Sequence, residues 1–261
     1  MADADLLDDA VALPGDEAAP AAAPGERADD EKVMSLVDHL SELRRRIGLA
    51  LLAVAIGTVV GFILAPRILD VLKAPYGSDP LILLAPGEGF FIYLKIALVT
   101  GVVLGMPVIL WQLWLFISPG LTRQERRLAR PWVPLALVFF VLGVSIAYFV
   151  LPFAVAFLGS FGQEGALRNS WTADGYFGFV AMMFLAFGLV MEYPIVLVLL
   201  SKVGIVTSQR LRSSRRLVIV VIAVVAAVAT PGGDIISPMA LGVTMYLLYE
   251  LSIVLVRVGG H

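Results

Sequence analysis

Three glutamates stand in surroundings that could give them a chemical role. Glu42 precedes three consecutive arginines, Glu125 lies inside a cluster of arginines, and Glu192 lies deep in an apolar stretch. Such carboxylates can hold an incoming cation or carry a proton. The chain has no cysteine and only two histidines, at opposite ends, which leaves almost no material for thiolate chemistry, a Ser-His-Asp triad or a histidine metal site. We therefore expect no catalytic residue, no metal and no cofactor.

The composition indicates the class of protein that holds these glutamates. Hydrophobic residues make up 59% of the chain and charged residues 15%. A soluble domain carries roughly 45–50% apolar and about 25% charged residues. A chain with so little polar surface cannot cover itself in water, so we expect an all-α polytopic membrane protein.

The apolar residues fall into six stretches: 47–65, 96–117, 132–162, 176–200, 217–230 and 235–256. Each of the first four is about as long as one bilayer crossing or longer. The fifth has 14 residues, or roughly 21 Å of helix against a hydrocarbon core of about 30 Å. We predict six transmembrane helices with short helices five and six, the last spanning only from Pro238 onward. The fifth needs local thinning of the bilayer or shelter by its neighbours.

Basic residues alternate between the loops and so predict the orientation. The three arginines directly before the first stretch and the loops after the second, fourth and sixth together provide 13 Lys and Arg, whereas the opposite loops carry 4. Cytoplasmic loops are enriched in Lys and Arg. Both termini are therefore expected to lie in the cytoplasm.

The N-terminal tail differs from the rest of the chain. Residues 1–31 hold ten acids and one arginine, in an Ala- and Pro-rich setting without an apolar period. This composition is typical of disorder, and the tail lacks the basic and apolar regions of a secretory signal. We divide the chain into a disordered acidic tail, 1–33, which we interpret as a solvated spacer, a six-helix domain, 34–257, and a short C-terminal tail, 258–261. Translation could also start at Met34.

Glu42 belongs to an amphipathic helix, 35–46, that leads into the first span. The segment alone favours an intrahelical pair between Glu42 and Arg45 or Arg46. The alternative is an acidic docking point. His39 is interpreted as a packing residue because no second titratable partner is evident.

The loop after the second stretch leaves two alternatives open for Glu125. The carboxylate either neutralises the neighbouring arginines or is held ready for an incoming cation. Trp111, Trp114 and Phe116 precede the loop and are typical of an interfacial aromatic belt. They could also line an apolar peptide groove.

Glu192 is interpreted as functional, because an acid inside a membrane is costly. Pro194 follows it and should kink the helix, which could open a polar pocket. The alternative is a protonated glutamate that is hydrogen-bonded between helices. For Glu250, nearer the basic end, a structural hydrogen bond is favoured.

Several functions lack their motifs. The sequence contains no G-x-x-x-x-G-K-[ST], no G-x-S-x-G and no H-E-x-x-H, which argues against a P-loop ATPase and an intramembrane protease. The basic residues lie only where topology requires them, so nucleic-acid binding has no support.

Six motifs, in order, resemble the TatC family, the multispanning subunit of the twin-arginine protein translocase. The resemblance covers residues 34–256. The motifs are His39-Leu-Ser-Glu-Leu-Arg-Arg-Arg46, Pro107-Val-Ile-Leu-Trp-Gln-Leu-Trp-Leu-Phe-Ile-Ser-Pro-Gly-Leu121, Glu125-Arg-Arg127, Phe187-Gly-Leu-Val-Met-Glu-Tyr-Pro194, Thr230-Pro231 with Asp234, and Met245-Tyr-Leu-Leu-Tyr-Glu250.

The resemblance implies functional residues. Glu42 and Glu125 match the family's site for the paired arginines of a signal peptide, and a guanidinium can bind a carboxylate through two parallel hydrogen bonds that lysine cannot reproduce. Positions near that site match Arg44, Arg46, Phe116 and Arg123. Glu192 matches the family's intramembrane glutamate, which contacts the inserted peptide or a partner helix, Pro75 matches a proline of the first outside loop, and Asp234 matches an acid after the fifth helix.

The resemblance also implies a fold and a transport role. The family folds as a cup of six helices whose concave face meets lipid, in the cytoplasmic membrane. It uses the proton motive force to export folded proteins, recruits single-span TatA-like and TatB-like partners, and self-associates in the complex. Such a chain is a receptor and assembly core and not an enzyme.

The sequence departs from the family pattern in three places. The acidic tail is not part of the common family core, and relatives often carry other residues at the positions of Pro238 and Thr244. These differences concern the outer end of the last two helices. The rival hypothesis is a proton-coupled solute transporter in which Glu192 titrates, although the halves show no inverted repeat. A purely structural scaffold would leave Glu125 and Glu192 unexplained.

Overall fold

The computed structural model describes residues 36–123, 126–127, 130–161, 171–202, 206–230 and 233–258. The chain separates into two compact units, Met1–His39 and Leu40–His261. The acidic tail, 1–33, and the end of the C-terminal tail, 259–261, lie outside the described residues, so the division into tails and helical domain stays a prediction.

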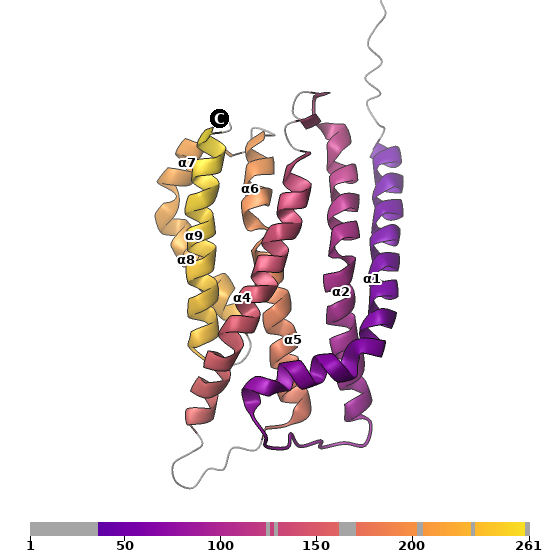
Figure 1. Cartoon of the computed structure of the whole chain (residues 1–261). Coiled ribbons are helices and arrows are strands. Elements are labelled where there is room, and N and C mark those ends of the chain that lie inside the picture. Colours follow the sequence, from indigo (N-terminus) through magenta and orange to yellow (C-terminus); the bar gives the residue numbers. More distant parts are fainter. Residues whose placement is uncertain are drawn as a thin grey trace, which may run out of the picture. The chain divides into compact units, whose positions relative to one another are not determined.

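The described residues form helices joined by loops, with no strand among them beyond one isolated bridge. Figure 1 shows the helices standing side by side. They are α1 (Leu36–Lys73), η1 (Ala74–Tyr76), α2 (Glu88–Ile117), η2 (Ser118–Gly120), α4 (Trp132–Ser160), α5 (Ala173–Val190), α6 (Tyr193–Lys202), α7 (Ser208–Ser213), α8 (Arg215–Ala229) and α9 (Ile236–Val258). The predicted all-α architecture is confirmed.

Five segments of the described chain are long and apolar enough to cross a membrane: His39–Tyr76, Glu88–Gly120, Trp132–Ser160, Ala173–Ser201 and Ile236–Arg257. They contain the first, second and fourth predicted spans, and they overlap nearly all of the third and the sixth. The fifth predicted span forms α8, whose 15 residues give roughly 22 Å of helix. A crossing by α8 stays a prediction.

The helices expose most of their apolar surface, as lipid-facing helices do. Only 11% of the most apolar window of the first segment is buried, and 22% of that of α4. The best-buried helix is α5, which packs against α2, α4, α8 and α9. Its side chains Tyr176, Met183 and Phe187 are almost completely buried, so the core follows α5.

α5 and α6 form one interrupted helix. The break falls at Met191 and Glu192, where the Glu192 amide donates to the carbonyl of Leu189 at 3.1 Å, three residues back. Pro194 has no amide hydrogen to donate one turn back, so the regular helix cannot continue through this point. The kink predicted from Pro194 is confirmed.

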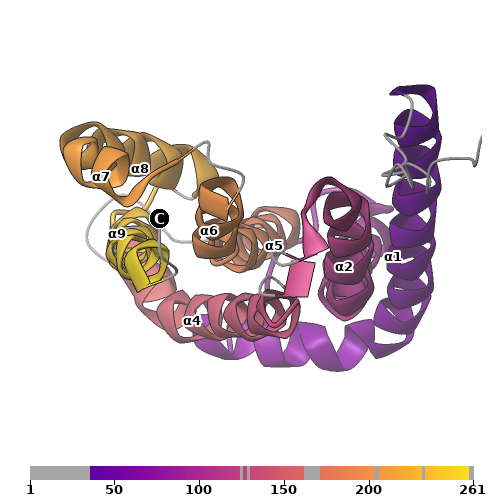
Figure 2. The same cartoon turned by 90° about the horizontal axis from the view of Figure 1, so that it is seen from above.

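The first part of α1 stands beside α2 and runs in the opposite direction, and the rest of α1 turns away across the lower end of the other helices (Figure 1). Figure 2 shows this second part of α1 passing along α4. Two glycine pairs, Gly57–Gly61 and Gly101–Gly105, lie between the first part of α1 and α2. A Cβ atom built on Gly57 would lie 2.7 Å from the carbonyl oxygen of Gly101, and one on Gly61 would lie 2.6 Å from that of Ala97. Small residues let membrane helices approach this closely. The backbones touch, so the register of the two helices is fixed.

Candidate functional site

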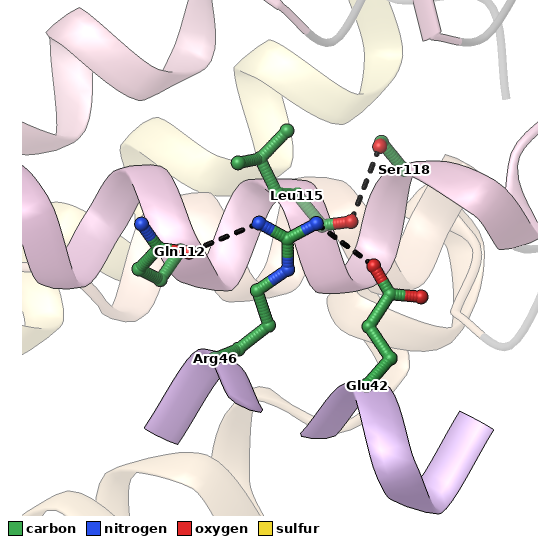
Figure 3. Close-up of polar contacts among 5 residues, drawn as sticks. All are labelled: Glu42, Arg46, Gln112, Leu115 and Ser118. Carbon is green, nitrogen blue, oxygen red and sulfur yellow. Dashed lines mark hydrogen bonds and ion pairs between the residues drawn. The ribbon is translucent and has the colours of Figure 1, made fainter. Parts of the chain in front are cut away.

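Glu42 is held at the arginine-rich end of the helices, where α1 begins and α2 ends. Arg46, one turn further along α1, donates from Nη2 to Glu42 Oε1 at 2.8 Å and from Nη1 to Gln112 Oε1 on α2 at 3.1 Å (Figure 3). The side chains of Glu42 and Arg46 are 18% and 20% exposed. The intrahelical pair expected for Glu42 is confirmed, with Arg46 as its partner, and α2 orients that pair.

The register of α1 and α2 places Glu42 relative to the end of α2. Gly61 faces Ala97, Gly57 faces Gly101, and Arg46 bonds Gln112. Each step of four residues back along α1 therefore matches a step of four forward along α2. One further step puts Glu42 level with Phe116, one residue before α2 ends at Ile117. Figure 3 shows the carboxylate beside the last turn of α2.

The other residues predicted near this site differ in exposure. Arg44 on α1 and Arg123 in the loop after η2 are exposed, whereas Phe116 is partly buried. Glu125 lies outside the described residues, so its approach to Glu42 stays a prediction.

The start of the loop that carries Glu125 is tied to the end of α2. Arg126 donates from Nε and Nη2 to the carbonyl oxygen of Ser118, at 3.0 and 2.7 Å. A cation suits this position because the last carbonyls of a helix lack intrahelical donors. No sequence pattern distinguishes Arg126 from the neighbouring arginines.

The aromatic residues of α2 divide between two environments. Trp111 is 44% exposed, as a belt residue is expected to be. Trp114 is 7% exposed and packs with Leu121 and with Trp132 of α4. One of the two tryptophans is therefore part of the core below the loop.

Glu192 lies at the break between α5 and α6 and is partly buried. Among the described residues, no hydrogen-bond partner reaches its buried Oε1 atom. The described part of the chain therefore gives no support to a carboxyl satisfied between helices at that oxygen, and a donor from outside the chain could bind it.

Glu250 of α9 makes the structural contact expected of it. Arg215 of α8 donates from Nη2 to its Oε2 at 2.7 Å, and the Tyr246 hydroxyl donates to Oε1 at 3.3 Å. Tyr249 donates its hydroxyl hydrogen to the carbonyl oxygen of Leu211 in α7. These bonds hold α7 and the start of α8 to α9.

Asp234 and Pro75 lie at the opposite end from Glu42. Asp234 is 4% exposed, and its Oδ1 accepts a hydrogen bond from the Ser237 amide at 2.5 Å, which caps the start of α9. No described residue forms a hydrogen bond with its buried Oδ2. Pro75 is in η1. The next residue of η1, Tyr76, packs its ring against the rings of Trp171 and Tyr176. Neither residue is near Glu42.

The same end carries a polar cluster that the sequence did not indicate. Lys95 of α2 forms an ion pair with Asp174 of α5 at 2.5 Å, and Glu88 accepts from the Asp174 amide at 3.1 Å. Lys95 directly precedes the second apolar stretch. A basic side chain at the edge of an apolar stretch was the one sequence feature that could have indicated this ion pair. Gln112 is the one side-chain amide within that stretch. A polar side chain among apolar residues indicates a polar partner on another helix, which here is Arg46.

The site geometry is suited to binding a ligand. The described residues contain no cluster of three or more His, Cys, Asp or Glu that could hold a metal ion. At the arginine-rich end they offer an oriented carboxylate, exposed arginines and apolar side chains at a helix end.

Comparison with known proteins identifies the family of this chain. A family model described as Sec-independent protein translocase protein (TatC) matches residues 38–243. The chain belongs to the TatC family.

Individual TatC proteins match most of the chain. One from Frankia casuarinae is 40% identical over 245 residues, covering 88% of this chain and 67% of that protein. One from Aquifex aeolicus is 38% identical, covering 85% of this chain and 94% of that protein. A crystal structure of the twin arginine translocase receptor TatC matches with a TM-score of 0.74 at 37% identity, covering 84% of this chain and 99% of that one.

Family membership makes the chain a multi-pass membrane component of a Sec-independent protein translocase. The recognition made from the six sequence motifs is confirmed. The rival hypothesis of a solute transporter loses its basis, since TatC proteins are translocase components.

Proposed function

We propose that the chain is the receptor for twin-arginine signal peptides and the assembly core of its translocase. The arginine pair binds Glu42 and Glu125 on the cytoplasmic side of the membrane. The observation that carries the proposal is the Glu42 carboxylate, which Arg46 and Gln112 orient beside the last turn of α2. The loop with Glu125 begins at that turn.

Glu42 has the capacity to bind an incoming guanidinium. Arg46 occupies its Oε1, and among the described residues no hydrogen bond reaches Oε2. A carboxylate offers about four lone-pair sites, so a second arginine can bind while Arg46 stays in place. The resulting preference for arginine over lysine follows from the planar fork of the guanidinium.

The neighbouring residues support the same site. Phe116, level with Glu42, offers an aromatic face on which a guanidinium can stack. Arg44 and Arg123 are exposed and repel an arginine pair that binds anywhere except at the carboxylates. The two exposed arginines therefore favour the one position of the peptide in which its arginine pair lies at the carboxylates.

The arginine distribution supports the orientation, with the Glu42 end and both termini in the cytoplasm of a bacterial-type cell and the chain in the cytoplasmic membrane. TatA-like and TatB-like single-span proteins are the proposed partners, together with further copies of this chain. The proton motive force drives export of the folded precursors. Glu192, whose buried Oε1 meets no hydrogen-bond partner among the described residues, is proposed to contact the inserted peptide or the polar face of a partner helix.

The test is binding of a twin-arginine signal peptide and its Lys-Lys counterpart to the purified full chain in detergent. The wild type is expected to prefer Arg-Arg, and Glu42→Gln or Glu125→Gln to lose roughly 10- to 100-fold in affinity for it, since hydrogen bonds to charged groups contribute about 1.5–3 kcal/mol. Glu250→Gln is the matched control, because Glu250 lies on α9 and is paired with Arg215. Its affinity should stay unchanged.

Equal binding of both peptides would contradict the site if it persists when a TatB-like protein is added. A Glu42→Gln variant that exports twin-arginine precursors normally in cells would contradict it as well.

A further inference from the structure

A surface hollow lies between α2 and α5, at the end of the molecule opposite to the candidate site. The two helices pack against one another and lie side by side in both views (Figure 1 and Figure 2). The charged residues that line the hollow are Lys95 of α2 and Asp174 of α5. Its apolar lining includes Leu158, Trp171 and Phe179. The hollow therefore combines charges of both signs with apolar surface.

The ion pair in this hollow is open to a further ligand. Lys95 Nζ lies 2.5 Å from Asp174 Oδ1, and the two side chains are 34% and 53% exposed. Among the described residues, no other hydrogen bond reaches the Lys95 ammonium, and none reaches Asp174 Oδ2. An ammonium group has three donors, and a carboxylate has about four acceptor sites. A ligand can therefore bind both charges while the pair stays intact.

Glu88 and Gly178 hold the pair in position. Glu88 accepts a hydrogen bond from the Asp174 amide at 3.1 Å, and its carboxylate adds a second negative charge to the cluster. A Cβ atom built on Gly178 would lie 3.3 Å from Lys95 Nζ, so the glycine leaves room for the ammonium group beside α5. Two carboxylates and one ammonium give the cluster a formal charge of −1. This charge disfavours a ligand that is only anionic.

The surroundings place the hollow at the level of lipid headgroups. Lys95 directly precedes the apolar stretch 96–117, and lysines at the ends of membrane helices extend their ammonium groups to the interface. Trp171 lines the hollow, and tryptophan is enriched at the same level of the membrane. Next to the hollow, Leu98 of α2 is 52% exposed and Met182 of α5 is 44% exposed. The lipid-facing surface therefore continues into the hollow.

We infer that the hollow binds a phospholipid whose headgroup carries a primary ammonium, the chemistry of phosphatidylethanolamine. The phosphate accepts hydrogen bonds from Lys95, and the ammonium donates to Asp174 Oδ2. The headgroup and the ion pair then lie as two antiparallel dipoles, and an acyl chain follows Leu98 and Met182. The lipid joins α2 to α5 at this end. The inference does not depend on the proposed receptor function.

Other common headgroups satisfy only part of the cluster. Phosphatidylcholine has the phosphate, but its quaternary ammonium has no N–H to donate to Asp174. Phosphatidylglycerol has no cation, and its negative charge meets a cluster that is already negative. Hydrogen bonds between ionised partners are about twice as strong as neutral ones. The arrangement of charges therefore favours phosphatidylethanolamine over both.

The first test measures binding of these three phospholipids, with identical acyl chains, to the delipidated full chain in mild detergent by native mass spectrometry. The wild type is expected to bind phosphatidylethanolamine about tenfold more tightly than the other two. Asp174→Asn should bind phosphatidylethanolamine and phosphatidylcholine nearly equally. Lys95→Gln should bind both about tenfold more weakly and keep the preference, because the phosphate is common to both lipids.

Glu250→Gln is the matched control, because Glu250 forms a similarly exposed ion pair with Arg215 elsewhere in the molecule. Its preference among the three lipids should equal that of the wild type. A preference that persists in Asp174→Asn would overturn the inference. Tightest binding of phosphatidylglycerol by the wild type would overturn it too, since Lys95 would then act alone.

The second test fills the hollow and leaves both charges in place. Phosphatidylethanolamine should raise the melting temperature of the wild type in detergent more than phosphatidylcholine does. Gly178→Leu should lose this difference, whereas Gly48→Leu should keep it, since a Cβ atom at Gly48 meets nothing within 4 Å. Melting without added lipid shows whether Gly178→Leu folds, and Gly178→Val repeats the test if it does not. An equal difference in Gly178→Leu and the wild type would place the lipid elsewhere.

Discussion

The contact between α1 and α2 predicts that an added methyl group at Gly101 will loosen the arginine-rich end. A Cβ atom at Gly101 would lie 2.6 Å from the Thr58 amide nitrogen and 2.8 Å from the Val54 carbonyl oxygen, where ordinary contact begins at 3.4 Å. The helices must therefore separate by roughly 0.6 to 0.8 Å in Gly101→Ala. The nearest atom, Thr58 Oγ1, belongs to a side chain, but the amide nitrogen and the carbonyl oxygen belong to the backbone, so rotation of Thr58 alone cannot make room.

The free energy of unfolding of Gly101→Ala combines a loss from overpacking with a gain from the higher helix propensity of alanine. Overpacking of this kind costs about 1–3 kcal/mol, and alanine is favoured over glycine inside a helix by up to about 1 kcal/mol. We expect a net loss of about 1–2 kcal/mol, or a melting temperature about 2–8 °C lower. The same separation would stretch the 3.1 Å bond between Arg46 and Gln112, so peptide affinity should fall too.

Thermal unfolding in a mild detergent measures the first effect, and peptide binding measures the second. Gly48→Ala is the matched control, since a Cβ atom at Gly48 of α1 meets nothing within 4 Å. That variant should be at least as stable as the wild type. A Gly101→Ala protein that melts and binds like Gly48→Ala would refute the argument that backbone contact fixes the register.

Three further predictions concern other parts of the fold. Asp234→Ala should lower the melting temperature by the equivalent of about 1 kcal/mol, because the cap on the Ser237 amide is lost, and Asp234→Asn should retain most of the stability; equal loss in both would contradict a capping role. Glu192→Gln should leave the melting temperature unchanged or raise it, since no described residue forms a hydrogen bond with the buried Oε1, and a clear fall would reveal a partner. Arg215→Ala should cost less than about 1 kcal/mol in unfolding measurements, because its pair with Glu250 is largely open to solvent; a larger loss would indicate a coupled network.

The apolar stretches were predictable because each depends on local composition, whereas the helices extend beyond them: α1 runs from Leu36 to Lys73 and α2 begins at Glu88. The apolar stretches, the kink before Pro194 and the short α8 can be seen within windows of about 20 residues. The motifs around Glu42 and Glu192 were specific enough to identify the family.

The contacts between helices were harder to predict because they depend on register. The sequence contains Gly57, Gly61, Gly101 and Gly105 at matching spacing, but only the antiparallel alignment shows that the two pairs face one another. The partner of Arg46 follows from that alignment. The capping bond of Asp234 joins residues close in sequence, yet its burial depends on elements from elsewhere in the chain.

The glycine contacts between α1 and α2 have a consequence for biogenesis. α1 and α2 are consecutive in the chain, and their backbones approach each other closely at Gly57, Gly61 and Gly101. The hairpin can close as soon as α2 has left the ribosome and entered the bilayer, before α5 is synthesised. Its early closure places Glu42 at the end of α2 while the rest of the protein is still being translated. α8, by contrast, packs chiefly on α9, so the weakest span depends on the helix that is made last.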